Sequence, residues 1–170
     1  MNRCTTLTLT TMALFCLAVA VLAGDAAAQQ RSLKEQLVGT WTVVSCATTS
    51  ANGAKQPYCA NPKGILILDA GGRYASVTAN RDRPKFTTNN RLEIPAEQFK
   101  AAVVGFAANF GTWSVNEADK TMTIHYEGAL FPNNEGADLT RSVSLVGDEL
   151  KLTGPQVLGG RTETVYQRAK

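Results

Sequence analysis

Polar and apolar residues alternate along much of the chain beyond residue 39, and this alternation predicts β-strands with one buried face. It is strictest at residues 121–127, where Met122, Ile124 and Tyr126 share one face and polar side chains share the other. Eight segments of strand character, separated by turn residues, predict strands at residues 40–46, 64–69, 73–79, 112–115, 121–127, 139–146, 149–153 and 161–168.

Short, mostly hairpin-like links between these segments favour an antiparallel meander. Eight strands close a barrel just wide enough for side chains or for one small ligand. We therefore expect a mainly β protein, an eight-stranded antiparallel up-and-down barrel. An open sandwich is the alternative.

Two segments have helical character. Ser32 with Glu35 three positions later is a capping-box pattern, which predicts a short N-terminal helix that stops before Gly39. Between Pro95 and Gly111, five apolar residues fall on one helical stripe: Phe99, Ala102, Val103, Phe106 and Phe110. The spacing predicts one inserted amphipathic helix of about four turns, packed on the barrel or covering one end.

The first 28 residues have the pattern of an export signal. Arg3 precedes an uncharged, largely apolar segment, and three alanines at 26–28 form a small-residue cleavage pattern. We expect cleavage after Ala28, with Ala23 as second choice, leaving residues 29–170 as the barrel domain. An uncleaved anchor is disfavoured because the apolar segment is shorter than the ~20 residues of a membrane span. The expected location is the bacterial periplasm or the exterior, without stable membrane insertion.

Cleavage at that point removes two of the four cysteines. Cys46 and Cys59 remain, and an oxidising compartment favours a disulfide between them. Closing a loop of this size adds about 3 kcal/mol by the chain-entropy argument. Two free buried thiols are the alternative.

Charge and composition exclude several classes of function. The net charge is only +3, which argues against a dedicated nucleic-acid binder. One His and few clustered Cys leave little material for a metal site, and we expect no metal and no cofactor.

The candidate chemistry depends on which face of residues 121–127 looks inward. His125 and Glu127 share the polar face, and inside a barrel they would form an acid–base pair. If the apolar face looks inward, His125 points outward. Five basic residues also lie within positions 73–91: Arg73, Arg81, Arg83, Lys85 and Arg91. At a pocket mouth they would favour anionic ligands such as fatty acids; the alternative is a solvated loop in which Asp82 pairs with Arg81 or Arg83.

The segment Gly39-Thr40-Trp41 resembles the Gly-x-Trp signature of lipocalins. In that fold the Trp closes the bottom of the barrel and an Arg from the last strand packs across it. The resemblance thus implies structural roles for Gly39, Trp41 and Arg168, with a cation–π contact worth roughly 0.5–2 kcal/mol.

A longer resemblance, from Leu37 to about Arg168, is to the bacterial and fungal lipocalin-like domain family. It is carried by residues 37–45, 62–64, 72–74, 82–86, 110–113, 125–127 and 130–133, with Gly136 and Arg141. The chain departs from the family at Ile124, where many members have His, at Asn109, where many have Tyr, and at Asn134, where many have an aromatic residue. The resemblance implies a barrel with a pocket.

Our first hypothesis is an exported, monomeric barrel that binds a small apolar or amphipathic molecule, which is anionic if the basic loop borders the pocket. The sequence leaves open whether the protein is an enzyme and favours a binding protein. The nominated ligand-binding residues are His125, Tyr126, Arg83, Arg141 and Phe106. A second hypothesis is an isomerase or cyclase that uses His125 and Glu127 in the cavity. A third is an inhibitor of exported proteases or lysozymes, in which side chains fill the barrel and the loop at 51–63 makes the contact.

Overall fold

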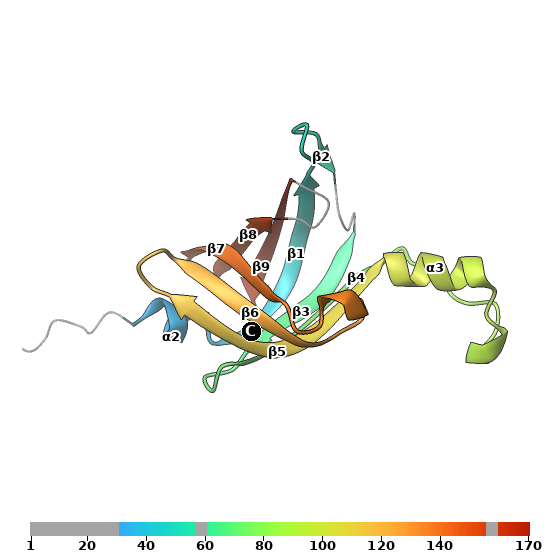
Figure 1. Ribbon diagram of the computed structural model, residues 1–170, viewed down its shortest axis with the longest axis horizontal. Helices are drawn as coiled ribbons and strands as arrows, with labels where there is room; N and C mark the ends of the chain where they lie inside the picture. Colours follow the sequence, from blue (N-terminus) through green and yellow to red (C-terminus); the bar gives the residue numbers. More distant parts are fainter. Residues whose placement is uncertain (1–30, 57–60, 156–159) are drawn as a thin grey trace, which may run out of the picture. The chain divides into compact units, whose positions relative to one another are not determined.

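A closed antiparallel sheet is the main feature of the protein (Figure 1), as predicted. The computed structural model describes residues 31–56, 61–155 and 160–170. In chain order, the barrel strands are β1 (Gly39–Thr49), β3 (Pro62–Leu68), β4 (Arg73–Asn80), β5 (Phe106–Asn116), β6 (Thr121–Ala129), β7 (Asp138–Val146), β8 (Glu149–Pro155) and β9 (Arg161–Arg168). A two-residue strand, β2 (Lys55–Gln56), pairs with the end of β1 inside the segment predicted to be a loop. Pairing of β1 with β9 closes the sheet.

The largest departure from the predicted elements lies at the start of β5. The helix α3 (Ala96–Val104) ends at Gly105, so Phe106 and Phe110 belong to β5 and not to a helix. In β5 these residues pair with β4, with Phe106 opposite Ala79 and Phe110 opposite Ala75. The pairing satisfies backbone groups of β4 that would otherwise lack partners. The predicted four-turn helix with a single apolar stripe is therefore wrong in its second half.

The short helix α2 (Leu33–Leu37) closes one end of the barrel. Its capping box is present as predicted: the Ser32 hydroxyl accepts from the backbone N–H of Glu35, and the Glu35 carboxylate accepts from that of Ser32. Leu37 is fully buried, and its carbonyl accepts a 2.9 Å hydrogen bond from the indole N–H of Trp41. The helix thereby holds the floor of the barrel in position.

Arg168 completes this closed end, as the Gly-x-Trp resemblance implied. Its guanidinium carbon lies 4.1 Å from the ring centroid of the fully buried Trp41. Gly39 has a φ of +137°, and a Cβ there would lie 3.0 Å from Nη1 of Arg168. Glycine at this position therefore permits both the backbone conformation and the close approach of the guanidinium.

Residues 81–104, which we call the arm, extend beyond the ends of β4 and β5 (Figure 1). The arm folds back on itself: the rings of Phe86 and Phe99 stack 5.9 Å apart, and the Gln98 side chain hydrogen-bonds Thr87. At its base, the backbone N–H of Asn80 donates to the carbonyl of Gly105 at 2.8 Å. The arm is thus an insertion in the β4–β5 hairpin.

Within residues 31–56, 61–155 and 160–170, no helix has both the length and the apolar character needed to cross a bilayer.

Candidate functional site

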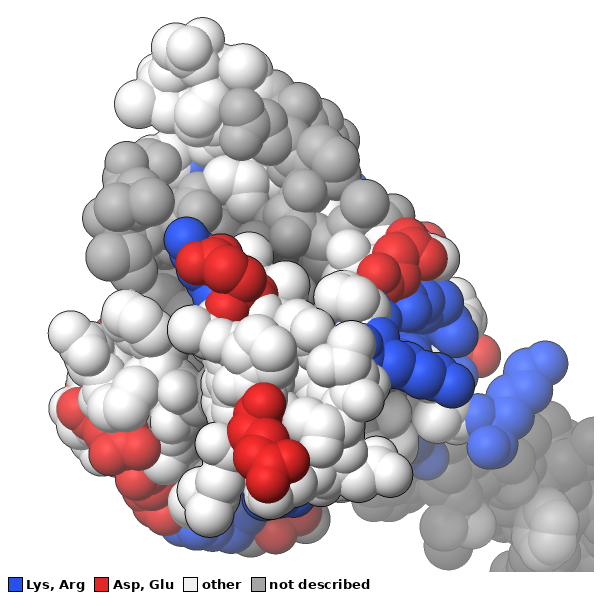
Figure 2. Space-filling model, turned by 90° about the vertical axis from the view of Figure 1, so that its right-hand side faces the viewer, with Lys and Arg blue, Asp and Glu red and all other residues white. Residues whose placement is uncertain are grey.

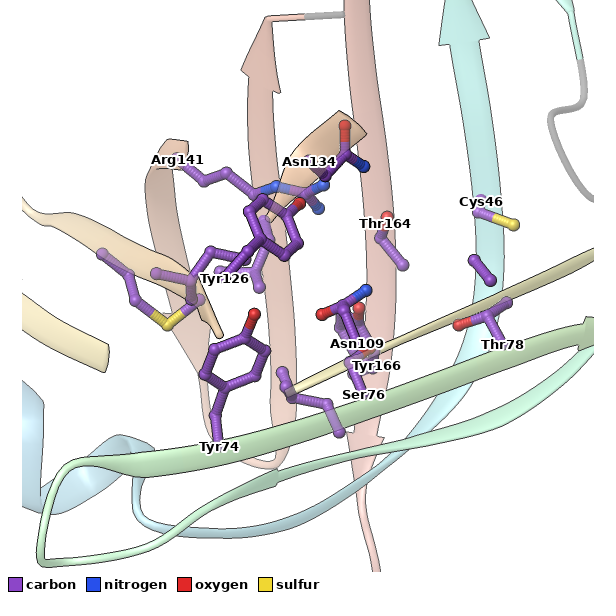
Figure 3. A pocket seen from close by; sticks show the side chains of 15 residues that line it. Cys46, Tyr74, Ser76, Thr78, Asn109, Tyr126, Asn134, Arg141, Thr164 and Tyr166 are labelled. Carbon is purple, nitrogen blue, oxygen red and sulfur yellow. The ribbon is translucent and has the colours of Figure 1, made fainter. Parts of the chain in front are cut away.

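A cavity of about 150 Å³ lies inside the barrel (Figure 3). The strand pleat explains its walls, because alternate residues of each strand point inward. Four aliphatic or thioether side chains supply apolar wall: Leu66, Met122, Ile124 and Leu152. Three tyrosines contribute rings and hydroxyls: Tyr74, Tyr126 and Tyr166. Other polar lining comes from Ser76, Thr78, Asn109, Asn134, Arg141 and Thr164.

Strand β6 settles which face of residues 121–127 looks inward. Met122, Ile124 and Tyr126 are buried, whereas His125 and Glu127 are exposed on the outer wall. The expectation that His125 contacts a ligand inside the barrel is therefore wrong. An acid–base pair of His125 and Glu127 acting within the cavity, which the isomerase or cyclase hypothesis required, is excluded for the same reason.

His125 and Glu127, which point outward from β6, have partners on other strands: Asp138 on the adjacent β7, and Arg73 on β4, on the far side of β5. Glu127 forms a bidentate ion pair with Arg73, in which Nη2 lies 2.7 Å from Oε2. Nδ1 of His125 lies 2.8 Å from a carboxylate oxygen of Asp138. The bond to Arg73 lowers the pKa of Glu127 below its usual range. These pairs are cross-strand contacts on a solvated surface.

Three polar atoms at the cavity are buried without a hydrogen-bond partner in the described part of the chain. They are the hydroxyl of Tyr74, Oδ1 of Asn109 and Nε of Arg141. A buried polar group without a partner costs about 1–3 kcal/mol. Three such groups around one space indicate that a bound molecule or ordered water supplies the missing partners.

Arg141 gives the cavity a positive charge. It lies on β7 at a position that alternates inward, as Val143 does. Among the described residues that line the cavity, none carries a carboxylate. Burial raises the pKa of Tyr74, and nearby Tyr126 raises it further, while the positive charge of Arg141 opposes both effects. Tyr74 is therefore a neutral hydroxyl near a guanidinium.

The two nominated residues Arg83 and Phe106 lie together at the base of the arm and outside this cavity. The guanidinium carbon of Arg83 is 4.6 Å from the centroid of the Phe106 ring, and Nη1 donates to the carbonyl of Ala102 at 3.3 Å. Arg83 also borders a hollow of about 650 Å³ with four other basic residues: Lys63, Arg81, Lys85 and Arg91. Figure 2 shows the face on this side, where Lys and Arg side chains gather beside acidic ones.

The five residues predicted to bind ligand therefore lie in three different parts of the protein. Tyr126 and Arg141 line the cavity, Arg83 and Phe106 lie at the arm, and His125 lies on the outer wall. Sequence reasoning missed Tyr74 and the other inward polar residues of β4, β5 and β9. Tyr74 lies in a strand that was predicted correctly. The sequence does not reveal which face of that strand looks into the barrel.

The disulfide and the signal peptide expected from the sequence both involve residues that the structure does not describe. Cys46 is buried and borders the cavity, whereas Cys59 lies outside the described residues, so the disulfide stays a prediction. The expected signal peptide at residues 1–28 also lies outside them. The described residues contain no group of three or more His, Cys, Asp or Glu side chains that could hold a metal ion.

Comparison with known proteins gives one family and several distant structures. A family profile described as a lipocalin-like domain matches residues 38–168. No curated protein matches the sequence. A redesigned β-barrel is 14% identical, with a TM-score of 0.43 over 83% of this chain and 98% of that one. A de novo designed fluorescence-activating β-barrel is 10% identical, with a TM-score of 0.43 over 82% of this chain and 100% of that one. A variant of the fluorescent protein UnaG is 13% identical, with a TM-score of 0.35 over 79% of this chain and 97% of that one.

Proposed function

The chain belongs to the lipocalin-like domain family, and on that premise we propose that it binds one small amphipathic molecule in the cavity of its barrel. The observation that carries the proposal is the set of unpartnered polar atoms on Tyr74, Asn109 and Arg141 around a partly apolar space. A ligand would bury its apolar body against the aliphatic wall, and these atoms would orient its polar end.

The cavity volume limits the size of this molecule. Sites for drug-sized ligands measure about 300–1,000 Å³, whereas a cavity of 150 Å³ is known to hold benzene. At about 150 Å³, this cavity suits a ligand near the size of one aromatic ring. A long acyl chain, such as that of the fatty acids considered from the basic loop, does not fit inside it.

The open cavity also weighs against the inhibitor hypothesis. That hypothesis needed a barrel filled by side chains, with function left to the surface. The space bordered by Tyr74, Asn109 and Arg141 is unfilled and has polar walls, which supports a ligand site instead.

Export forms part of the proposal. We infer it from the apolar segment and the alanines at 26–28, which have the pattern of a cleaved signal. The mature protein is then a periplasmic or secreted carrier that acts as a monomer. Intact-mass measurement of the protein from the periplasm tests both points, because cleavage after Ala28 gives a defined mass and native spectra give the oligomeric state.

Native mass spectrometry of gently purified protein tests the binding function. We expect a defined extra mass that is lost on collisional activation. Two neighbouring residues of β5 provide a matched pair of variants: Ala107 lines the cavity, and Ala108 lines a groove on the outer surface. Ala107→Phe fills the cavity and should abolish the extra mass, whereas Ala108→Phe should retain it. A bare polypeptide in every sample, also after incubation with a cell extract of small molecules, would contradict the function.

A further inference from the structure

We infer that the cavity selects a compact monocarboxylate, with a body about the size of one aromatic ring and its charged end at Arg141. This inference rests on the proposed binding function and adds the chemical class of the ligand.

Two other guanidinium groups that point from barrel strands have clear partners. Arg73 pairs with Glu127, and Arg168 lies over Trp41 while donating to two backbone carbonyls. Arg141 differs, because no ion pair or hydrogen bond links its side chain to the described residues, and its Nε is buried. Arg141 is part-buried, and a cation partly removed from water without a counter-charge is less stable, so an anion that enters the cavity gains the interaction that the protein leaves open.

The fold makes room for Arg141 to point inward. Its Cγ would lie only 2.9 Å from a Cβ placed on Gly154, and the carbonyl of Thr140 would lie 3.2 Å from the same atom. Any larger residue at 154 would push against the stem of Arg141. Glycine at position 154 on β8 therefore leaves the space that the Arg141 side chain occupies.

The groups near Arg141 fit a carboxylate. A guanidinium presents a planar fork of N–H donors that matches the two oxygens of a carboxylate. Tyr74 lies 4% exposed with its hydroxyl unpartnered, and this neutral hydroxyl is available to donate. Figure 3 shows the Tyr74 hydroxyl pointing into the cavity, on the side of Tyr126 and Arg141. One cation and one hydroxyl donor suit a single negative charge.

The rest of the lining describes the body of the ligand. Leu66, Met122 and Ile124 provide apolar wall, and the tyrosine rings provide faces on which a flat group can pack. Oδ1 of Asn109 is an unpartnered acceptor, which suits a hydroxyl or amine on that body. Benzoate has this size and charge, hydroxybenzoate adds a hydroxyl that could reach Asn109, and both serve as probes of the class.

Calorimetric titration with benzoate, benzyl alcohol and phenyl phosphate tests the inference. Benzyl alcohol has nearly the size of benzoate but no charge. We expect benzoate to bind at least about tenfold more tightly than benzyl alcohol, because a charge-assisted bidentate bond is about twice as strong as a neutral one. Arg141→Gln should remove that preference while leaving the affinity for benzyl alcohol within about twofold. Lys100→Gln, an equal charge change on an exposed arm residue, should leave the preference intact.

Each other outcome has a distinct meaning. Equal affinity for benzoate and benzyl alcohol, or an equal loss of both in Arg141→Gln, would overturn the carboxylate assignment and leave the binding function standing. Tighter binding of phenyl phosphate than of benzoate would also overturn it, in favour of a phosphate ligand. If none of the three probes binds, and the purified protein carries no extra mass, the binding function itself fails.

Discussion

The guanidinium of Arg168 lies over the indole of Trp41, 4.1 Å from the ring centroid, and joins the last strand of the barrel to the first. Two carbonyls of the α2 segment also accept from this guanidinium, Gln36 at 2.6 Å and Val38 at 3.1 Å. One side chain thus holds the floor helix, the first strand and the last strand together.

Arg168→Ala should lower the free energy of unfolding by about 2–4 kcal/mol, because it removes a cation–π contact and two charge-assisted hydrogen bonds. Asp148→Asn is the matched control. It removes the 3.4 Å ion pair of Arg168 with a well-exposed carboxylate, which should cost less than about 1 kcal/mol. Urea unfolding followed by Trp fluorescence measures both. Equal losses in the two variants would contradict the role given to the stack.

Gly111 marks an irregularity between β5 and β6, where pairing shifts between Phe110 and Gly111. A Cβ at this position would lie 1.9 Å from the backbone oxygen of His125, which cannot move without breaking the ladder. Gly111→Ala should therefore cost at least about 3 kcal/mol. Gly71→Ala is the control, since its nearest atom would lie at an ordinary 3.4 Å, and its effect should stay within about 1 kcal/mol. Thermal melts of the two variants provide the comparison.

The pKa of Glu127 should lie below its usual value because Arg73 hydrogen-bonds and attracts its carboxylate. A lowered folded-state pKa stabilises the protein above the unfolded-state pKa, and this contribution is lost as the pH falls through the folded-state value. Arg73→Gln should return the pKa towards its ordinary value of 4.5 and reduce the acid-side loss of stability. NMR titration of the side-chain carboxyl carbon measures the shift. An unchanged pKa in Arg73→Gln would show that the pair does not hold the carboxylate.

The arm should be removable without unfolding the barrel. Asn80 and Gly105 face each other across the base of the arm and are joined by a 2.8 Å backbone hydrogen bond. Replacing residues 81–104 by Asn-Gly would convert this base into a two-residue hairpin turn. The shortened protein should melt within about 5 °C of the full chain. A molten spectrum in circular dichroism would mean that the arm contributes to the core.

His125→Ala should leave ligand binding unchanged. The side chain is on the outer wall, and its contact with Asp138 is between two exposed groups. We expect a stability change within about 1 kcal/mol and no change in benzoate affinity. Tyr126→Phe is the comparison on the same strand, since it alters a hydroxyl at the cavity. A loss of binding in His125→Ala that equals the loss in Tyr126→Phe would contradict the placement of the two faces.

Strand number and order were predictable because burial of one face imposes a period of two on each strand. The start of β5 was not predictable, because Phe106 and Phe110 fit the spacing of a helix that contains Phe99 as well as that of an alternating strand. Local periodicity cannot separate these two readings. Pairing with β4 favours the strand, because the β4 backbone from Arg73 to Ala79 offers seven consecutive pairing positions to β5.

The site was predictable only in part, for a related reason. Tyr126 and Arg141 were predicted to bind ligand, and both line the cavity. His125 was predicted to do the same, although it is the sequence neighbour of Tyr126. Adjacent strand residues face opposite sides, so at most one of the two could point inward. Tyr74 and Asn109 were missed because the inward parity of their strands depends on register with neighbours, which the sequence of one strand does not contain.

The seam between β1 and β9 has a consequence for the maturation of the protein. Cys46 on one side of the seam, and Thr164 and Tyr166 on the other, are walls of the cavity. A nascent chain that has released β1 to β8 therefore has two open edges and no complete binding site. Under the proposed function, a ligand can therefore bind only after β9 has closed the barrel, and a ligand present during folding would stabilise the closed molecules against reopening and against proteases.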